Sequence, residues 1–580
     1  MSNDQTSKAE QEIDKCFFRA SAMDFKKIPG GPIAYWTSEA IGKAFVCGTP
    51  LKVIIKPKQG TSTGDDETFV RFWHEVKWQD VGIGIASLSE SQESGFKYFP
   101  LNKGGDNRRW YGNNEKILRF DPPAFNRLSE LGNHLPSKDL YFRPGLTWSK
   151  IASGCLGVRK DDAGFIFSSV GLKGFPEPKD VFQSLSFMNS IVAQTLITAI
   201  SSSMSIVSGD IEKLPYMRNE LNVDNNAKKL VLTARNDWDS YETSWDFTTL
   251  PILHSDHHQS SLKATYQKLR AHWRDMTLEM HRLEQENNRL FIDAYDLQAE
   301  LTPEVPLDEI TLTCNPHYQY GGNKSLEELE ALLVADTMRD LVSYAVGCMF
   351  GRYALDKPGL IIADQGESIE DYLKQIPEPS FPADDDNAIP MLDGDWFTDD
   401  IAERFRKFLR VAFGEEYYEA NLRFVEQALN IKGKRNYSIR DYFLGDFYTD
   451  HVKRYKKRPI YWLFSSPKGS FNALIYMHRY RPDNVSVVLN DYLREFRTKL
   501  TARRDHLEAV SISAGASTGE KTTALKDIEK ISKIIVELDD YERDVLYPLA
   551  TKQIEIDLDD GVKVNYPKFG DALKKIPGLF

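Results

Sequence analysis

The 580-residue sequence has 73 Lys and Arg against 85 Asp and Glu, and the formal net charge of −12 excludes a protein that coats nucleic acid through its overall charge. No apolar run reaches the ~18 residues that a membrane span needs, and the polar N-terminus lacks the apolar core of a signal peptide. Five scattered cysteines form no CxxC pair and indicate reduced thiols, so we expect a cytoplasmic protein of three or four domains.

The sequence pattern of residues 1–215 predicts a β-rich domain of short strands that is closed by a helix. Aromatic and β-branched runs separated by Gly, Asn and Pro turns are typical of such a domain. The expected strands are residues 51–56, 69–78, 97–101, 117–120, 139–143, 155–159 and 164–168. From residue 179 to about residue 207 the apolar period becomes helical.

Residues 216–362 predict a helical spacer whose strongest signal is a heptad helix at residues 256–301. Apolar residues there alternate by four and three over about five heptads, which predicts a buried seam. Asn287 occupies an a position, where a buried amide typically determines register or partner number. The seam must pack against another helix, either in this chain or in a partner.

The last third of the chain predicts a linker followed by a helical domain. Residues 363–395 are acidic and interrupted by prolines, which favours a surface linker. Residues 396–580 predict a mostly helical C-terminal domain, and the expected fold class of the whole chain is α+β.

Sequence patterns for catalysis and metal binding are weak. An adenine methyltransferase needs a Gly-rich cofactor loop after a strand and an Asn-Pro-Pro-aromatic tetrapeptide, but residues 315–318 read Asn-Pro-His-Tyr and favour a turn between helices. His254, His257 and His258 lie where the heptad helix opens, and exposed histidines there favour no zinc site. We therefore expect no catalytic, cofactor-binding or metal-binding residue in this chain.

The loops of the first domain carry residue types suited to DNA. Lys and Arg can neutralise phosphates, Asn can pair with adenine edges, and the pair of glycines at 104 and 105 lets a backbone approach closely. The alternative is a well-turned loop packed by Trp110 and Tyr111. The candidate DNA-binding residues are Asn102, Lys103, Asn107, Arg108, Arg109, Trp110, Tyr111, Asn113, Arg143, Thr147, Trp148, Ser149, Lys150, Ser168, Ser169 and Lys173.

A second basic segment, KRYKKRP, has Tyr and Trp beside it. Such a segment favours phosphate contact, and a solvated face is the alternative. The possible phosphate contacts are Lys453, Arg454, Lys456, Lys457 and Arg458.

Several of these blocks together resemble a known family. They are IPGGPIAYW, FPLNKGGDNRRWYGNN, YFRPGLTWSKI with GFIFSSVGLKGFP, DWDSYETSWDF, YAVGCMFGRYALDKPGL and KRYKKRPIYWLFSSPKGSFNALIYMHRY. As a set they resemble the C-terminal, non-catalytic half of the PglX family, the adenine-specific DNA methyltransferases of BREX phage defence, which are related to fused type II restriction-modification enzymes. The first domain is also similar to the target-recognition domains of type I specificity subunits.

The resemblance implies a role in recognition without chemistry. A full family member carries the cofactor loop and an Asn-Pro-Pro-Tyr motif upstream of the blocks seen here, so its catalytic residues have no counterpart in this chain. The resemblance implies that this chain selects a site in double-stranded DNA, while a methyltransferase part, bound in trans or fused, supplies S-adenosylmethionine and methylates adenine at N6. Other BREX proteins are the further expected partners.

Two alternatives to a recognition module stay open. A structural or assembly subunit of a defence complex would use the helices and would have no DNA preference of its own. A stand-alone nuclease would use Asp65 or Asp66 with the Glu75 and Lys77 pair around a metal ion, a short pattern that is frequent by chance in an acidic chain.

Overall fold

The computed structural model describes residues 25–32, 36–132, 134–151, 155–201, 203, 205–217 and 223–579. The expected frayed segment of residues 1–20, with Cys16, and part of the 28–36 motif lie outside the described residues. The chain forms two compact units, each built from three stretches of sequence. Unit 1 comprises Met1–Val70, Gly82–Trp238 and Trp273–Gly321, and unit 2 comprises Arg71–Val81, Asp239–His272 and Gly322–Phe580.

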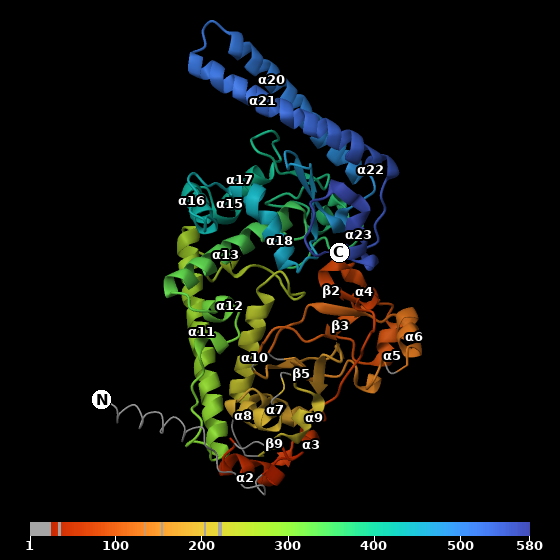
Figure 1. Cartoon of the computed structure of the whole chain (residues 1–580), viewed down its shortest axis with the longest axis vertical. Coiled ribbons are helices and arrows are strands. Elements are labelled where there is room, and N and C mark those ends of the chain that lie inside the picture. The colour runs from red at the N-terminus through yellow and green to blue at the C-terminus, as the bar shows by residue number, and fades with distance from the viewer. Residues whose placement is uncertain are drawn as a thin grey trace, which may run out of the picture. The chain divides into compact units, whose positions relative to one another are not determined.

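Unit 1 is built around two small sheets (Figure 1). One sheet has the strand order β2-β4-β3-β7, with β3 antiparallel to β4 and parallel to β7, and the other is antiparallel with the order β6-β5-β8. A two-stranded pair, β1-β9, joins distant segments. The strands are β1 (Thr49–Pro50), β2 (Val70–Phe72), β3 (Tyr98–Asn102), β4 (Lys116–Arg119), β5 (Gly145–Ser149), β6 (Val158–Asp161), β7 (Ile166–Phe167), β8 (Gly171–Gly174) and β9 (Pro215–Tyr216).

Two of the expected strands are wrong. Residues 51–56 form helix α3 (Lys52–Ile55), because Leu51 and Ile55, four residues apart, share one fully buried face. Residues 139–143 contain the end of the 3₁₀ turn Lys138–Leu140, and Phe142 has φ +69°, which is not the extended backbone of a strand. The expected strand at 69–78 is limited to β2, with 3₁₀ turns after it.

The helices of unit 1 cover these sheets and include the heptad segment. The expected helix at 179–207 is divided at Asn189, whose amide pairs with both backbone groups of Val158 at 2.9 Å, and Ser190 then caps the next helix. The helices are α2 (Glu39–Cys47), α4 (Asp66–Phe69), α5 (Leu88–Glu93), α6 (Pro122–Glu130), α7 (Val181–Met188), α8 (Ile191–Ile200), α9 (Ser208–Lys213), α10 (Asp224–Asp239), α11 (Leu262–Ala294) and α12 (Pro316–Tyr320).

The helix expected at residues 256–301 is the shorter α11, Leu262–Ala294, and most residues of its heptad seam are buried inside this chain. Its first turns, to His272, belong to unit 2, and the rest belongs to unit 1. Asn287 is buried and its amide donates to the carbonyl oxygen of Ser186 at 3.0 Å. The sequence had left open a partner chain as the cover of this seam, and the structure provides an internal one. The seam residues are Leu262, Tyr266, Leu269, Trp273, Met276, Met280, Leu283, Asn287, Leu290, Ala294 and Leu297.

Unit 2 is mostly helical around one small antiparallel sheet with the order β10-β12-β11. Within this unit α20 and α21 run side by side as a long hairpin (Figure 1). The elements are α13 (Leu326–Met349), α14 (Ile369–Gln375), β10 (Ile389–Pro390), α15 (Ile401–Phe413), α16 (Tyr418–Leu429), α17 (Ile439–Tyr442), the π-helical turn η8 (Phe443–Phe447), α18 (Tyr448–Arg454), β11 (Tyr461–Ser465), β12 (Asn472–Tyr476), α19 (Asn484–Val487), α20 (Glu495–Ile512), α21 (Thr518–Tyr541), α22 (Tyr547–Lys552) and α23 (Val562–Asn565).

Residues 363–395 are not a separate surface linker, because several of them pack inside unit 2. Ile389 pairs with Leu474 of β12, and Tyr372 and Phe381 are buried. Of the acidic residues that suggested a linker, Asp384 is buried and binds Arg404 at 2.7 Å, while Glu370, Glu378 and Asp385 are exposed. The α+β class expected from the sequence is confirmed. None of the helices in the described part of the chain has both the length and the apolar composition that crossing a bilayer requires.

Candidate nucleic-acid interface

Three loops of unit 1 meet at one end of its sheets. β3 and β7 run parallel and finish together, so Lys103 and Ser168 follow neighbouring strand ends. In the antiparallel pair of β5 and β8, Ser149 lies opposite Gly171, which brings Lys150 and Ser169 to the same end. Strand topology therefore gathers residues from three distant parts of the sequence on one surface, which we call the loop surface.

The loops of this surface touch one another. Ser149 Oγ donates to the carbonyl oxygen of Gly105 at 3.1 Å, and the backbone N–H of Lys150 donates to the carbonyl oxygen of Val170 at 2.8 Å. Gly104 has φ +79°, and a Cβ at this position would lie 3.2 Å from the same oxygen of Val170. Glycine is needed here for its backbone conformation and its small size.

Few side chains of the loop surface are free to contact a ligand. Lys103 is about one quarter exposed and forms an ion pair with Asp66 at 2.7 Å. Lys150 and Ser169 are half-buried, and Lys150 has no side-chain partner among the described residues. Arg143 is fully exposed, but it precedes β5 whereas Lys150 follows it, so the two side chains lie at opposite ends of a five-residue strand of roughly 16 Å.

Arg108 is buried under the loop surface instead of pointing into solvent. Its guanidinium lies 3.4 Å from a carboxylate oxygen of Asp237, donates to the carbonyl oxygen of Thr311 at 3.3 Å, and stacks 4.8 Å from the ring centre of Trp238. Tyr318 closes the site, since its hydroxyl donates to the carbonyl oxygen of Asn107 at 2.6 Å.

Arg109 and Trp110 are held by the same glutamate. Glu284 of α11 accepts from Arg109 Nη1 and from Trp110 Nε1, each at 2.7 Å, while Glu309 binds Arg109 Nη2 at 2.7 Å. Burial alone would lower the pKa of the Arg109 guanidinium, but the two carboxylates raise it above its ordinary value. Trp110 is fully buried with φ +73°, a strained conformation for a bulky residue, and these contacts hold it there.

A second ionic cluster lies between the strands. Lys173 and Asp161 are fully buried and form an ion pair at 3.2 Å, and burial raises the pKa of Asp161 and lowers the pKa of Lys173. Burial also lowers the pKa of the neighbouring Arg159 to about 10. Lys173 therefore stabilises the sheet from inside and has no solvent-exposed atom to offer a phosphate.

The structure divides the sequence-predicted DNA contacts into three groups. Asn107 and Asn113 build the loop, through the carbonyl of Asn107 and a 2.8 Å bond from the Asn113 amide to Asp106. Contact with DNA stays a prediction for all of them, but the buried set fits the alternative of a loop packed by its aromatic residues. The buried set is Asn102, Arg108, Arg109, Trp110, Tyr111, Thr147, Trp148, Ser168 and Lys173. The accessible set is Lys103, Arg143, Ser149, Lys150 and Ser169.

The KRYKKRP segment in unit 2 is divided in the same way. Arg454 is bound by Asp340 and by Glu242, and Arg458 lies 3.6 Å from Glu75. Lys453, Lys456 and Lys457 are exposed, and the last two adopt φ values of +49° and +61°. Left-handed backbone in two successive lysines costs roughly 1–2 kcal/mol each. The accessible phosphate candidates are therefore the three lysines.

The residues of the weak catalytic patterns, Asn315 and Glu75, make hydrogen bonds to the backbone. Asn315 is the buried N-cap of α12 and donates to the carbonyl oxygens of Leu307 and Ile310. Glu75 accepts backbone N–H bonds from Phe72 and Val562. No group of three or more His, Cys, Asp or Glu side chains is placed to hold a metal ion within the described residues.

The residues that sequence reasoning missed are the carboxylates beneath the loop. Asp237, Glu284 and Glu309 come from three separate segments, and no local pattern links them to Arg108 or Arg109. A glutamate beside an apolar seam is the usual polar flank of a heptad, so Glu284 gave no signal of burial.

This chain is similar to known proteins over nearly its whole length. No protein-family model matches it. It is 34% identical over 578 residues to the adenine-specific methyltransferase BrxX of Escherichia coli O9:H4 (strain HS), an alignment that covers 97% of this chain and 46% of that protein. It is 32% identical over 569 residues to the adenine-specific methyltransferase PglX of Lacticaseibacillus casei (strain Zhang), covering 95% of this chain and 45% of that protein.

The chain is homologous to part of BrxX and PglX. It spans about half the length of these curated relatives. The similarity extends through both units, so the buried ionic clusters and the loop surface all lie in the aligned region, which covers 97% of the chain.

Proposed function

We propose that this chain is the DNA sequence-recognition part of a BREX-type site-specific adenine-N6 DNA methyltransferase that serves phage defence. The observation that carries the proposal is the homology to part of two adenine-specific methyltransferases. S-adenosylmethionine and the catalytic residues belong, in this proposal, to a methyltransferase part in trans or fused, and base flipping needs that part.

The loop surface of unit 1 is the proposed contact with base pairs. Lys150 has no side-chain partner among the described residues, and Ser149 and Ser169 present hydroxyls. Lysine suits phosphate, and hydroxyls and backbone N–H groups suit phosphate oxygens or base edges. The exposed lysines 453, 456 and 457 of unit 2 are proposed to contact phosphates only.

Arg108 and Arg109 act on recognition indirectly in this proposal. Their guanidinium groups are bound by Asp237, Glu284 and Glu309, and they hold residues 103–113 against the helices. We therefore assign them a positioning role, with the conformation of the loop as the property they control.

Selection of random-sequence duplexes by the purified chain at two salt concentrations tests the proposal. An enriched motif of about six base pairs, with affinity that falls as salt rises, is the expected result. Lys150→Ala should weaken binding and lower the slope of log K against log salt by about one phosphate contact. Arg143→Ala is the matched control, because this exposed residue lies at the opposite end of β5.

Equal losses in the two variants would place the contact elsewhere, and loss in Arg143→Ala alone would move it to the other end of the sheet. Absence of any enriched motif, with the methyltransferase part also added, would refute recognition by this chain. It would favour the alternative of an assembly subunit. In the described residues the heptad seam is already covered, so that alternative rests on the α20–α21 hairpin, where Ile512 is 83% exposed and Leu525 58% exposed.

A further inference from the structure

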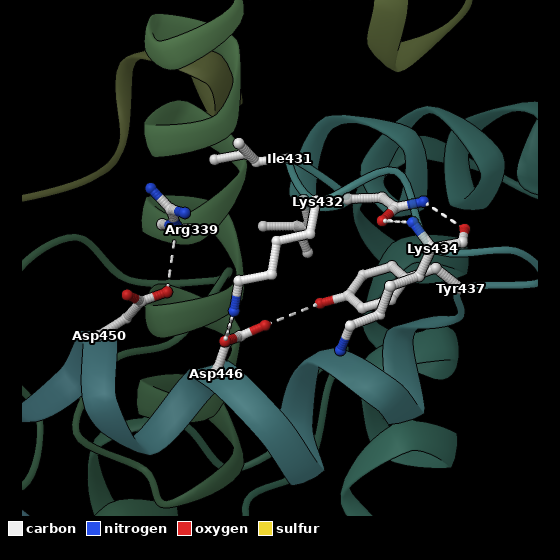
Figure 2. A pocket seen from close by; sticks show the side chains of 9 residues that line it. Arg339, Ile431, Lys432, Lys434, Tyr437, Asp446 and Asp450 are labelled. Atoms are coloured by element: carbon white, nitrogen blue, oxygen red, sulfur yellow. Dashed lines mark hydrogen bonds and ion pairs between the residues drawn. The ribbon is translucent and has the colours of Figure 1, made fainter.

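Unit 2 has a pocket that none of the proposed DNA contacts uses. Its volume is about 140 Å³, and it lies between the loop after α16, Arg339 of α13, and the helical stretch of η8 and α18 (Figure 2). The loop is closed by Asn430, whose side chain accepts from the backbone N–H of Lys434 and donates to its carbonyl oxygen, both at 2.8 Å. This closure gives a short loop a defined shape.

Two lysines of this loop line the pocket together. Figure 2 shows Lys432 and Lys434 extending on the same side, toward Asp446. Lys432 Nζ lies 3.1 Å from Asp446 Oδ1, and the hydroxyl of Tyr437 lies 3.4 Å from the other oxygen of this carboxylate. Lys434 has no carboxylate within 4 Å among the described residues, and its amino group lies 5.6 Å from the ring centre of Tyr437.

The charges of the lining leave one cation in excess. Arg339 binds Asp450 at 3.0 Å and also Asp336, which lies outside the lining, at 2.5 Å, while Lys432 is paired with Asp446. Lys434 is the cation of the lining without a carboxylate partner among the described residues, and Lys432, whose side chain is 69% exposed, has further N–H groups to donate. The side of the pocket that carries these two amino groups favours an anion.

The volume and the lining residues of the pocket favour a small anion with a carbon skeleton. A volume of about 140 Å³ equals about five water molecules at ~30 Å³ each, enough for a phosphate group and a few carbon atoms. Leu429, Ile431 and the ring of Tyr437 offer apolar contact to those carbons, and Asp446 can accept a hydroxyl hydrogen. The same carboxylates repel a long polyanion such as duplex DNA.

We propose that this pocket binds a small phosphate ester, whose phosphate contacts Lys432 and Lys434 while its hydroxyl group donates to Asp446. The site does not depend on DNA recognition by unit 1. It gives the chain a small-molecule site in unit 2 that is separate from the lysines proposed to contact DNA phosphates.

Titration calorimetry of the full chain with glycerol 3-phosphate, inorganic phosphate and a 20-base-pair duplex tests the site. Glycerol 3-phosphate should bind saturably and more tightly than inorganic phosphate. Lys434→Gln removes one charge near the phosphate and should weaken glycerol 3-phosphate about five-fold, the effect of ~1 kcal/mol for one charge pair in water. Asp446→Asn removes the competing carboxylate and should tighten inorganic phosphate.

Lys526→Gln is the matched control, because Lys526 is an exposed lysine of α21 in the same unit and lines no part of the pocket. Lys434 is exposed on a loop, so its substitution should leave the thermal unfolding midpoint unchanged. Equal affinities in Lys434→Gln and Lys526→Gln, or no saturable binding of glycerol 3-phosphate, would overturn the proposal. So would weaker duplex binding in Lys434→Gln with glycerol 3-phosphate unaffected, since the loop would then contact DNA.

Discussion

Two buried arginines, one in each unit, are neutralised in different ways. Arg109 in unit 1 is bound by two carboxylates, Glu284 and Glu309, each at 2.7 Å. Arg352 in unit 2 is fully buried, yet no carboxylate lies within 4 Å of it among the described residues. It donates instead to the hydroxyl of Tyr476 at 2.7 Å and to that of Tyr353 at 3.3 Å.

Aromatic rings complete the surroundings of Arg352. Its guanidinium lies 5.3 Å from the ring centre of Trp73, 5.5 Å from that of Tyr353 and 5.9 Å from that of Tyr476. Ring faces and phenol oxygens carry partial negative charge and stabilise a desolvated cation. Separating the two partners of a buried ion pair has a high free-energy cost, because each charge is left unpaired. An aromatic cage, in contrast, stabilises a cation without an oppositely charged partner.

The largest expected effect on stability comes from removing a carboxylate that is paired with a buried arginine. Glu284→Ala leaves Arg109 partly unpaired and Trp110 Nε1 without an acceptor, and both groups are buried. Such a loss costs about 3–5 kcal/mol. Urea unfolding should show it, with hydrogen exchange assigning the change to unit 1.

Glu279→Ala is its control, since Glu279 lies on the same helix, is about half exposed and, among the described residues, forms an ion pair with Arg282 alone. The control should change the free energy of unfolding by less than about 1 kcal/mol. Equal effects of the two substitutions would show that the network beneath the loop contributes no stability.

A smaller effect is expected at the aromatic cage. Arg352→Met removes charged hydrogen bonds to tyrosine hydroxyls but leaves no carboxylate unpaired, so it should cost about 1.5–3 kcal/mol. Urea unfolding of unit 2 measures this cost. A loss as large as that of Glu284→Ala would mean that the cage contributes as much as an ion pair and would remove the distinction drawn between Arg109 and Arg352.

The smallest effect is a pH dependence beside the same cage. Burial lowers the pKa of His478 from its ordinary 6.5 to about 3, and the positive charge of Arg352 makes a smaller contribution in the same direction. The unfolded chain therefore binds a proton that the folded chain excludes, and stability present above pH 6.5 is lost as the pH falls toward 3. The free energy of unfolding should fall by about 1.4 kcal/mol for each pH unit below 6.5 from this residue.

His478→Gln keeps an N–H group for the carbonyl oxygen of Val76, which His478 Nε2 contacts at 3.1 Å, but it does not titrate. Its stability should depend less steeply on pH between 6.5 and 5 than that of the natural chain. His451 is buried and its pKa is also lowered, so part of the slope should remain. Identical slopes in both proteins would show that His478 is not kept neutral.

Local patterns predicted much of the fold. The α+β class, β3 and β4, helix α13 and the buried Asn287 follow from periodicity and turn residues. The strand expected at residues 51–56 failed because a short run with four apolar residues fits a buried helical turn equally well.

The candidate site was less predictable because charge alone does not reveal burial. Arg108 and Arg109 have the letters of a phosphate-binding loop, and only the distant carboxylates Asp237, Glu284 and Glu309 show that they face inward. Lys150 was predicted as a DNA contact from the residues around it in the sequence. It lies at the accessible end of β5, and its function stays a prediction.

The interleaving of the two units along the sequence limits how either unit could be exchanged between relatives. Unit 2 includes Arg71–Val81 and Asp239–His272 as well as Gly322–Phe580, so no single crossover separates it from unit 1. A transplanted unit 1 would need several junctions, and its Glu284 would have to arrive with the loop that it holds. Under the proposed function, new specificities should therefore arise more readily by substitution at Ser149, Lys150 and Ser169 than by recombination of whole segments.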